Sequence, residues 1–272
     1  GGARVAGRLA GGAEPVSAPH LIGWPLVDLR RAPEGARDRQ LLMGEAVEIM
    51  PPSSSGLTRG APGWVAVKAL RDGYPGYIPE AALSTGSVNH RVRARATHAY
   101  SAPDFKSTER LSLSFGARLE VLGEEGRFAE TPQGYVPRAH LVPLAERESD
   151  PVSVAELFLG TPYLWGGNSA FGIDCSGLVQ AGCLACGLPC PGDSGDQEAA
   201  LGETLPDDAP LQRGDLLFWR GHVGWVADPG TLLHANVHHM AVAYEHLQAA
   251  ISRIAAQGDG PVTARKRLKG LT

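Results

Sequence analysis

The first half of the chain consists of short runs of alternating apolar and polar residues, separated by turns that contain glycine. Residues 43–50 read Met-Gly-Glu-Ala-Val-Glu-Ile-Met, and residues 115–122 repeat this pattern as Phe-Gly-Ala-Arg-Leu-Glu-Val-Leu. The Gly-Tyr-Ile-Pro sequence at 76–79 returns as Gly-Tyr-Val-Pro at 134–137. Alternation with a period of two predicts β-strands, and many short strands with glycine turns are typical of small antiparallel barrels.

This internal repeat predicts two copies of one barrel. The copies cover residues 21–85 and 88–144, after an N-terminal extension over residues 1–20. The first copy is the longer one because it contains residues 51–62, which are rich in Pro, Ser and Gly. We expect this insertion to form a surface loop.

The pattern changes at residue 150, where helical spacing of apolar residues replaces the alternation. We predict a helix over 152–160 with Ser153 as its cap, and a second helix over 175–186 that ends at Gly187. Further elements are antiparallel strands over 215–219, 222–227 and 232–235, a helix over 244–256 and a final strand. Helices followed by a strand meander predict an α+β domain over residues 150–272.

Composition excludes several classes of protein. The 272 residues are 43% hydrophobic and 20% charged with a net charge of −4, which is typical of a globular protein and gives no reason to expect nucleic acid. We expect Arg265, Lys266 and Arg267 to form a solvated end or a strand edge. No stretch reaches the length of a membrane span, and the first twenty residues lack a signal-peptide core.

All four cysteines lie between Cys175 and Cys190, a poor layout for a disulfide framework. This favours a reducing compartment, so we expect a cytoplasmic protein, or a periplasmic or secreted one if a leader has been removed. Cys183, Cys186 and Cys190 suggest a zinc site with His238 or His239 as one alternative. Small buried apolar side chains explain them better, because Cys183 and Cys186 fall within a predicted helix without a second spaced pair.

The candidate chemistry centres on Cys175, at the start of the helix predicted over 175–186. The helix dipole and the free N–H groups there favour the thiolate, and the N–H of Cys175 can donate to an oxyanion. His222 and His234 follow on strand-like segments and can supply a general base and a group that orients it, although His238 and His239 could compete with His234. We therefore predict an acyl hydrolase that needs no metal or organic cofactor.

Four motifs resemble those of the NlpC/P60 cysteine peptidases. They are Pro162-Tyr163-Leu164-Trp165-Gly166-Gly167, Asp174-Cys175-Ser176-Gly177-Leu178-Val179-Gln180, Gly214-Asp215-Leu216-Leu217-Phe218 and Gly221-His222-Val223-Gly224. The upstream repeat resembles bacterial SH3 domains. The resemblance implies two SH3-like barrels followed by a papain-like α+β catalytic domain. The domain order is similar to that of γ-D-glutamyl-L-diamino acid endopeptidases, which implies a thiol protease that cleaves murein peptides in cell-wall turnover or recycling.

The resemblance also implies which residues bind the peptide. Glu45 would pair with the ammonium of a free N-terminal L-Ala, and Tyr77, or else Tyr74, would form a wall of the pocket. Glu45 becomes Ala117 in the second barrel, so folding of the barrel does not require this acid, although a solvated surface Glu is the alternative. Further substrate-binding residues of the catalytic domain would be Tyr163, Asp174 and Ser176.

Two other functions remain open. One is a papain-like amidase or acyltransferase acting on another amide of the cell wall, and the other is a wall-binding protein with an inactive peptidase domain. The presence of Cys175, His222 and His234 together argues against the second. The expected partner is a murein stem peptide, with no nucleic acid or membrane, and we expect a monomer.

Overall fold

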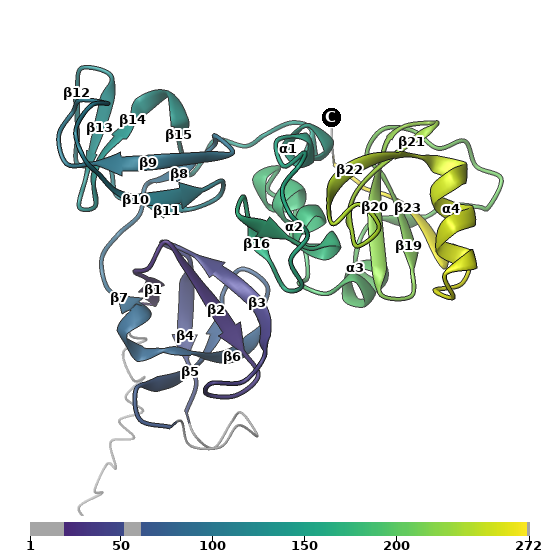
Figure 1. The fold of residues 1–272 in the computed structure, drawn as a ribbon, viewed down its shortest axis with the longest axis horizontal. Coiled ribbons are helices and arrows are strands. Elements are labelled where there is room, and N and C mark those ends of the chain that lie inside the picture. Colours follow the sequence, from purple (N-terminus) through teal and green to yellow (C-terminus); the bar gives the residue numbers. More distant parts are fainter. Residues whose placement is uncertain (1–18, 52–60, 271–272) are drawn as a thin grey trace, which may run out of the picture.

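The structure is a computed structural model that describes residues 19–51 and 61–270. Two small β-domains lie beside an α+β domain that forms the C-terminal half (Figure 1). Most of the expected N-terminal extension and of the 51–62 insertion lies outside the described residues. No helix in the described part of the chain is long and apolar enough to cross a membrane.

The first barrel is one seven-stranded sheet in the order β3-β2-β6-β5-β4-β1-β7. Its elements are β1 (His20–Ile22), β2 (Leu26–Arg30), β3 (Arg37–Leu42), β4 (Ala46–Ile49), β5 (Trp64–Ala69), β6 (Pro75–Pro79), the 3₁₀ turn η1 (Glu80–Ala82) and β7 (Leu83–Ser84). Alternate side chains point inward, so Leu29, Val47, Val67 and Ile78 are fully buried in one core.

The second barrel repeats the first in two smaller sheets. It contains β8 (His90–Val92), β9 (Ala96–Tyr100), β10 (Glu109–Ser114), β11 (Arg118–Leu119), β12 (Gly123–Glu125), β13 (Phe128–Thr131), β14 (Gly134–Pro137), η2 (Arg138–His140) and β15 (Leu141–Pro143). Gly44 and Gly116 occupy equivalent turns, with φ of 75° and 85°, a conformation that favours glycine. The predicted repeat is therefore one structural unit used twice.

The α+β domain packs helices against a six-stranded sheet. Its elements are α1 (Pro151–Glu156), β16 (Asn168–Ser169), β17 (Gly172–Ile173), α2 (Cys175–Ala185), α3 (Ser194–Ala200), β18 (Glu203–Thr204), β19 (Asp215–Trp219), β20 (His222–Asp228), β21 (Thr231–Asn236), β22 (Ala241–His246), α4 (Leu247–Ala256) and β23 (Ala264–Arg267). The sheet order is β18-β23-β19-β20-β21-β22. Apolar residues of α2, including Leu178 and Val179, join a core with Phe218, Val223 and Trp225. The predicted fold class is confirmed.

Three local predictions were wrong. Asp150, not Ser153, caps α1: its Oδ1 accepts from Val152 N at 2.9 Å, and Pro151 begins the helix. The helix predicted over 244–256 begins only at Leu247, because the preceding residues pair along the whole of β21. The basic residues near the C-terminus lie inside the sheet in β23, where Arg267 forms an ion pair with Asp215 at 2.8 Å.

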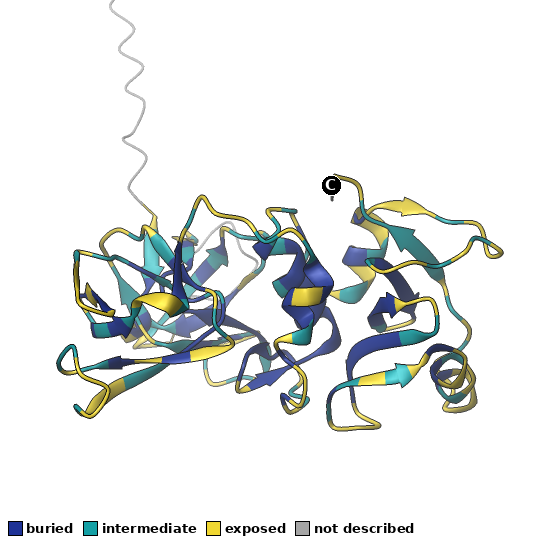
Figure 2. Cartoon of the chain, turned by 90° about the horizontal axis from the view of Figure 1, so that it is seen from above, coloured by how far each residue is buried: buried dark blue, intermediate teal, exposed yellow. Residues whose placement is uncertain are grey.

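The three domains pack directly on one another. Gln40 of β3 and Asn168 of β16 exchange hydrogen bonds of 3.2 and 3.3 Å, which attach the first barrel to the catalytic domain. The second barrel contacts the first through Arg118 N and Met43 O at 2.8 Å, and its Phe115 is part of the catalytic domain's core. Figure 2 shows buried residues concentrated in the helices and strands and exposed ones in the turns.

Candidate active site

Asp174 holds the start of α2 and so positions Cys175. Its Oδ1 accepts from Gly177 N at 2.7 Å and from Ser176 Oγ at 3.1 Å, and its Oδ2 accepts from Gly166 N at 2.9 Å. Residue 177 must be glycine, because a Cβ there would lie 2.5 Å from the carbonyl oxygen of Gly167. Cys175 is the first residue of the helix, where a backbone N–H has no acceptor within the helix. This N–H is available to an oxyanion.

The Cys175 thiol is buried against the two residues that flank His222. Its Sγ lies 4.0 Å from Gly221 O and is also close to the backbone N–H of Val223. Burial, followed by the charge of Asp174, raises the pKa of Cys175 to about 12, which outweighs the N–H groups of Val223 and Ser176. The expectation that the helix start favours the thiolate is therefore not met, because the raised pKa keeps the thiol neutral.

A chain of hydrogen bonds runs from His222 through the sheet. His222 Nε2 lies 2.8 Å from His234 Nδ1, and His234 Nε2 lies 3.1 Å from Glu245 Oε2. Arg253 donates to both oxygens of Glu245, at 2.7 and 2.8 Å. Gly224 leaves room for this arrangement, because a Cβ at that position would lie 3.1 Å from the Cβ of His234.

The two histidines are neutral near pH 7. Burial is the main cause that lowers the pKa of His222 to about 4 and that of His234 to about 3. Arg253 lowers the pKa of Glu245 to about 2, so Glu245 is a carboxylate and can only accept. His234 then carries its proton on Nε2, His222 donates from its own Nε2 to His234 Nδ1, and His222 Nδ1 is left with a free lone pair. That nitrogen is the candidate base.

The first barrel reaches the active site through Arg39 and Tyr74. The Arg39 side chain is 1% exposed; its Nη1 donates to Ser176 Oγ at 2.9 Å and lies 3.6 Å from Asp174 Oδ2. Tyr74 donates from its hydroxyl to Asp193 Oδ2 at 3.1 Å. Burial, followed by the charges of Asp193 and Asp38, raises the pKa of Tyr74. These contacts place a buried cation beside the helix that carries Cys175, and a tyrosine beside Asp193 at the start of α3.

The structure contradicts two of the predicted substrate contacts. Glu45 is buried in an ion pair with Arg71 Nη1, at 2.7 and 2.9 Å, and also accepts from Leu42 N at 3.0 Å. It is thus occupied and cannot serve as an unpaired acid for a substrate ammonium. Tyr77 is 1% exposed within the first barrel, so Tyr74, the second choice, is the tyrosine that contacts the catalytic domain.

The three remaining predicted residues lie around the nucleophile. Asp174 and Ser176 flank Cys175, are buried, and are hydrogen-bonded to each other. Tyr163 is half-buried and packs against the core that contains Cys175. Burial, followed by proximity to Cys175 and Asp174, raises the pKa of its hydroxyl. The structure therefore brings Cys175, Tyr163, Asp174 and Ser176 together with Arg39, which sequence reasoning had missed.

Two groups of residues carry side chains of the types that bind metals. Cys183 and Cys190 are buried in contact with each other, and Cys186 is partly exposed. Within the described residues, the group with metal-ligand spacing is His234, His239 and Glu245, whose ligand atoms lie within 4.8 Å of one another. A cation there would compete with Arg253 for Glu245 and would take His234 from its role beside His222.

Two family models match parts of the chain. The NlpC/P60 family matches residues 160–256, and the bacterial dipeptidyl-peptidase SH3 domain matches residues 29–83. The chain is 31% identical over 216 residues to the γ-D-glutamyl-L-lysine dipeptidyl-peptidase of Bacillus subtilis strain 168, covering 72% of this chain and 71% of that protein. The chain belongs to the NlpC/P60 family. The resemblance predicted from its motifs is thus confirmed, and with it the assignment as a cysteine peptidase.

Two further NlpC/P60 relatives cover most of the chain. The γ-D-glutamyl-L-lysine dipeptidyl-peptidase of Bacillus cereus ATCC 10987 is 27% identical over 236 residues, covering 75% of this chain and 64% of that protein. The crystal structure of an NlpC/P60 family protein from the same Bacillus cereus strain superposes with a TM-score of 0.73 at 21% identity. The superposition covers 93% of this chain and 100% of the crystallised chain, so the two share the three-domain architecture.

Proposed function

We propose that the protein is an endopeptidase that hydrolyses the amide between γ-linked D-Glu and the diamino acid of murein peptides. The observation that carries the chemistry is the hydrogen-bonded chain His222–His234–Glu245, together with Cys175, whose Sγ lies 4.0 Å from the carbonyl oxygen of the residue before His222. The substrate class is supported by the two relatives named as γ-D-glutamyl-L-lysine dipeptidyl-peptidases.

The reaction begins from a neutral thiol and a neutral imidazole. As Sγ of Cys175 attacks the γ-amide carbon, its proton passes to His222 Nδ1, and the backbone N–H of Cys175 donates to the oxygen that becomes negative. His234 and Glu245 stabilise the imidazolium. The proton then moves to the departing amine and leaves a thioester on Cys175. Water attacks the thioester while His222 takes its proton, which releases the γ-carboxylate and restores the thiol.

The amino end of the peptide needs a carboxylate other than Glu45. The Asp193 side chain is 54% exposed. Asp38 also lies near Tyr74, and its partner Arg31 is an exposed side chain, unlike the buried Arg71 that holds Glu45. Asp174 is instead neutralised by Arg39 and capped by backbone N–H groups. We therefore propose that Asp38 and Asp193 recognise the ammonium of a free N-terminal L-Ala, since a carboxylate and an ammonium form charge-assisted hydrogen bonds.

Mass spectrometry of the products tests the proposal. The protein is incubated with L-Ala-γ-D-Glu-L-Lys, with the corresponding diaminopimelate peptide, and with an N-acetylated form of each. We expect release of L-Ala-γ-D-Glu from the free peptides, abolished in Cys175→Ala and retained in the matched control Cys186→Ala at the other end of α2. Equal cleavage of the acetylated forms would contradict recognition of the amine. No cleavage of any peptide, with release of a muramoyl carboxylate from a muropeptide instead, would replace the endopeptidase by an amidase.

We also propose that the enzyme acts in the cytoplasm on imported murein peptides. Its four cysteines are all free, which suits a reducing compartment. Cell fractionation followed by immunodetection tests this, and recovery of the protein outside the cytoplasmic fraction would contradict it.

A further inference from the structure

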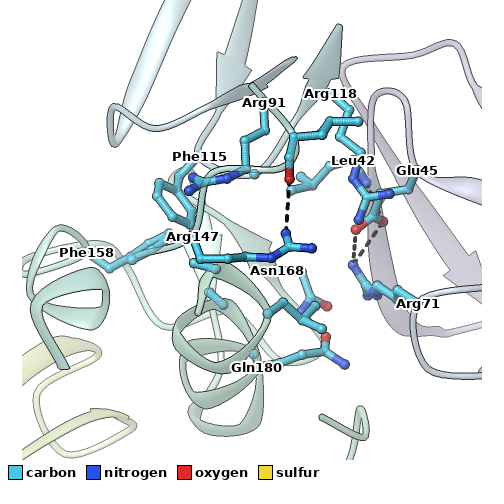
Figure 3. Close-up of a pocket in the computed structure, with 16 residues that line it drawn as sticks. Leu42, Glu45, Arg71, Arg91, Phe115, Arg118, Arg147, Phe158, Asn168 and Gln180 are labelled. Carbon is cyan, nitrogen blue, oxygen red and sulfur yellow. Dashed lines mark hydrogen bonds and ion pairs between the residues drawn. The ribbon is translucent and has the colours of Figure 1, made fainter. Parts of the chain in front are cut away.

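A cavity of about 270 Å³ lies where the three domains meet (Figure 3), and Cys175 is not among the residues that line it. The first barrel contributes Leu42 and Glu45, and the second contributes Phe115 and Arg118. The catalytic domain contributes one face of α2, formed by Gly177, Gln180, Ala181 and Leu184. Cys175 precedes Gly177 by two residues, about 200° around the helix, so it points to a different face. The cavity is therefore distinct from the active site.

Positive charge dominates the lining of this cavity. Four arginines face it, namely Arg71, Arg91, Arg118 and Arg147, against the single carboxylate of Glu45. Arg71 already neutralises Glu45 through two contacts of 2.7 and 2.9 Å. The other arginines have no acid in the lining to balance them.

Arg91 is a buried cation with unused donors. Its side chain is 8% exposed, and Nη2 donates to Glu148 Oε1 at 2.9 Å. Nε and Nη1 are buried and have no hydrogen-bond partner among the described residues. The guanidinium lies 5.9 Å from the centre of the Phe115 ring, which lines the same cavity. A buried donor without a partner is costly, so an acceptor in the cavity would stabilise it.

Arg118 and Arg147 supply two more open guanidinium groups. Within the described part of the chain, the Arg118 guanidinium makes no hydrogen bond or ion pair, and that of Arg147 donates only to the neutral carbonyl of Leu144, at 3.1 Å. In Figure 3 the Arg147 side chain reaches across the cavity. Arginine binds carboxylates through paired N–H donors, so groups on different walls favour a ligand with more than one acid.

The lining also contains apolar side chains, beside the polar Asn168 and Gln180. Phe115, Phe158, Leu42 and Leu184 provide hydrocarbon surface between the arginines. Inorganic phosphate would leave this surface in contact with water, whereas a short hydrocarbon between two carboxylates would cover it.

From these observations we propose that the junction cavity binds a small organic dicarboxylate, with Arg118 and Arg147 holding its acids and the apolar residues covering its carbon chain. The site is separate from Cys175, and the proposal stands whether or not the peptide substrate proposed above is correct.

Isothermal titration of the full chain with glutarate tests this site. We expect saturable binding that weakens at least tenfold in Arg118→Gln and in Arg147→Gln. The matched control Arg127→Gln changes an exposed arginine of the second barrel outside the cavity and should bind as the parent does. Glutaramide, which has the same length but no charge, should not bind, and inorganic phosphate should bind more weakly than glutarate.

Several results would overturn the proposal: no binding of glutarate, unchanged binding in both arginine variants, or phosphate binding as tight as glutarate. Thermal unfolding of each variant accompanies the titration. Since Arg118 and Arg147 make no ion pair in the described part of the chain, their variants should unfold at the parent's temperature. A loss of binding with an unchanged unfolding temperature then reports the site itself.

Discussion

Glu245 Oε2 lies 3.1 Å from Nε2 of His234, on the side of the ring away from His222. This contact sets the protonation pattern of both rings and thereby leaves His222 Nδ1 free to accept a proton. Sequence reasoning assigned Glu245 to a helix and gave it no role. In the structure β22 pairs His234 with Ala243, so Glu245, two residues later, projects from the same face of the sheet.

Glu245 should therefore be required for catalysis although it does not touch the substrate. We expect Glu245→Leu to lower kcat by about a hundredfold, at the low end of what general-base catalysis contributes, with KM little changed. Glu245→Gln keeps an oxygen that can accept from His234 and should retain more activity. Steady-state kinetics check this, with Glu203→Gln on the exposed strand β18 as the control. Equal activity of the Leu and Gln variants would contradict the positioning role.

Stability should fall as the medium becomes mildly acidic. His222 and His234 have pKa values of about 4 and 3 in the folded protein, below the ordinary value of 6.5 that applies after unfolding. Below pH 6.5 the unfolded chain therefore binds more protons, and the free energy of unfolding falls by up to about 1.4 kcal/mol per pH unit for each group. Above pH 6.5 neither histidine makes the free energy of unfolding depend on pH.

Urea denaturation at several pH values between about 5 and 8 measures this effect. The parent should lose stability toward pH 5, and His222→Gln should lose less over the same range because one of the two groups is gone. Glu245 adds little to the pH dependence of stability in this range, because its ordinary pKa of 4.5 and its lowered pKa of about 2 both lie below pH 5. If the free energy of unfolding fell equally with pH in the parent and in His222→Gln, the neutral, buried state of His222 would be contradicted.

The resting thiol should be protonated at neutral pH. The pKa of Cys175 is raised to about 12. Between about pH 6 and 9, ultraviolet thiolate absorbance should therefore change with pH in the same way in the parent and in Cys175→Ala. A step in this range that is absent from the variant would mean that the thiolate forms before substrate binds.

Arg39 should contribute to stability through its buried contacts with Asp174 and Ser176. Arg39→Leu leaves Asp174 without its cationic partner, and removing one member of a buried ion pair costs about 3–5 kcal/mol. Asp174 keeps three other hydrogen bonds, so we expect a value near the lower end. Urea denaturation compares this variant with Arg127→Leu, and a difference below about 1 kcal/mol would refute the expectation.

Recognition of the free amine should depend on Asp38 and Asp193 and not on Glu45. We expect Asp193→Asn and Asp38→Asn to raise KM for the free peptide, by about tenfold for a lost charge-assisted contact. Glu45→Gln should leave the preference for the free over the N-acetylated peptide unchanged, even if it lowers stability. Loss of that preference in Glu45→Gln alone would restore the role first expected of this acid.

Much of the architecture could be predicted because local patterns determine it. The barrel repeat, the strands from β19 to β21 and the helix that begins at Cys175 all follow from periodicity and glycine positions. Contacts between domains could not be predicted in this way. Glu45 and Tyr74 both lie in the first barrel. Glu45 meets Arg71 of the same barrel, whereas only packing against the catalytic domain decides that Tyr74 meets Asp193.

Two missed residues left weak signals in the sequence. Arg39 and Leu41 are two residues apart and so lie on the same face of β3. A charged residue on the apolar face of a strand suggests a buried partner. Glu245 was missed because Tyr244 to His246 have residue types compatible with a helix, and pairing with β21 overrode that preference.

Phe115 of the second barrel is buried in the interior of the catalytic domain. If residues 150–272 were expressed alone, the apolar site that Phe115 fills would be exposed to water, and this surface would favour self-association. The second barrel thus completes the hydrophobic core of the catalytic domain. A domain that replaced the second barrel, in nature or by engineering, would need an aromatic residue of its own to fill this site.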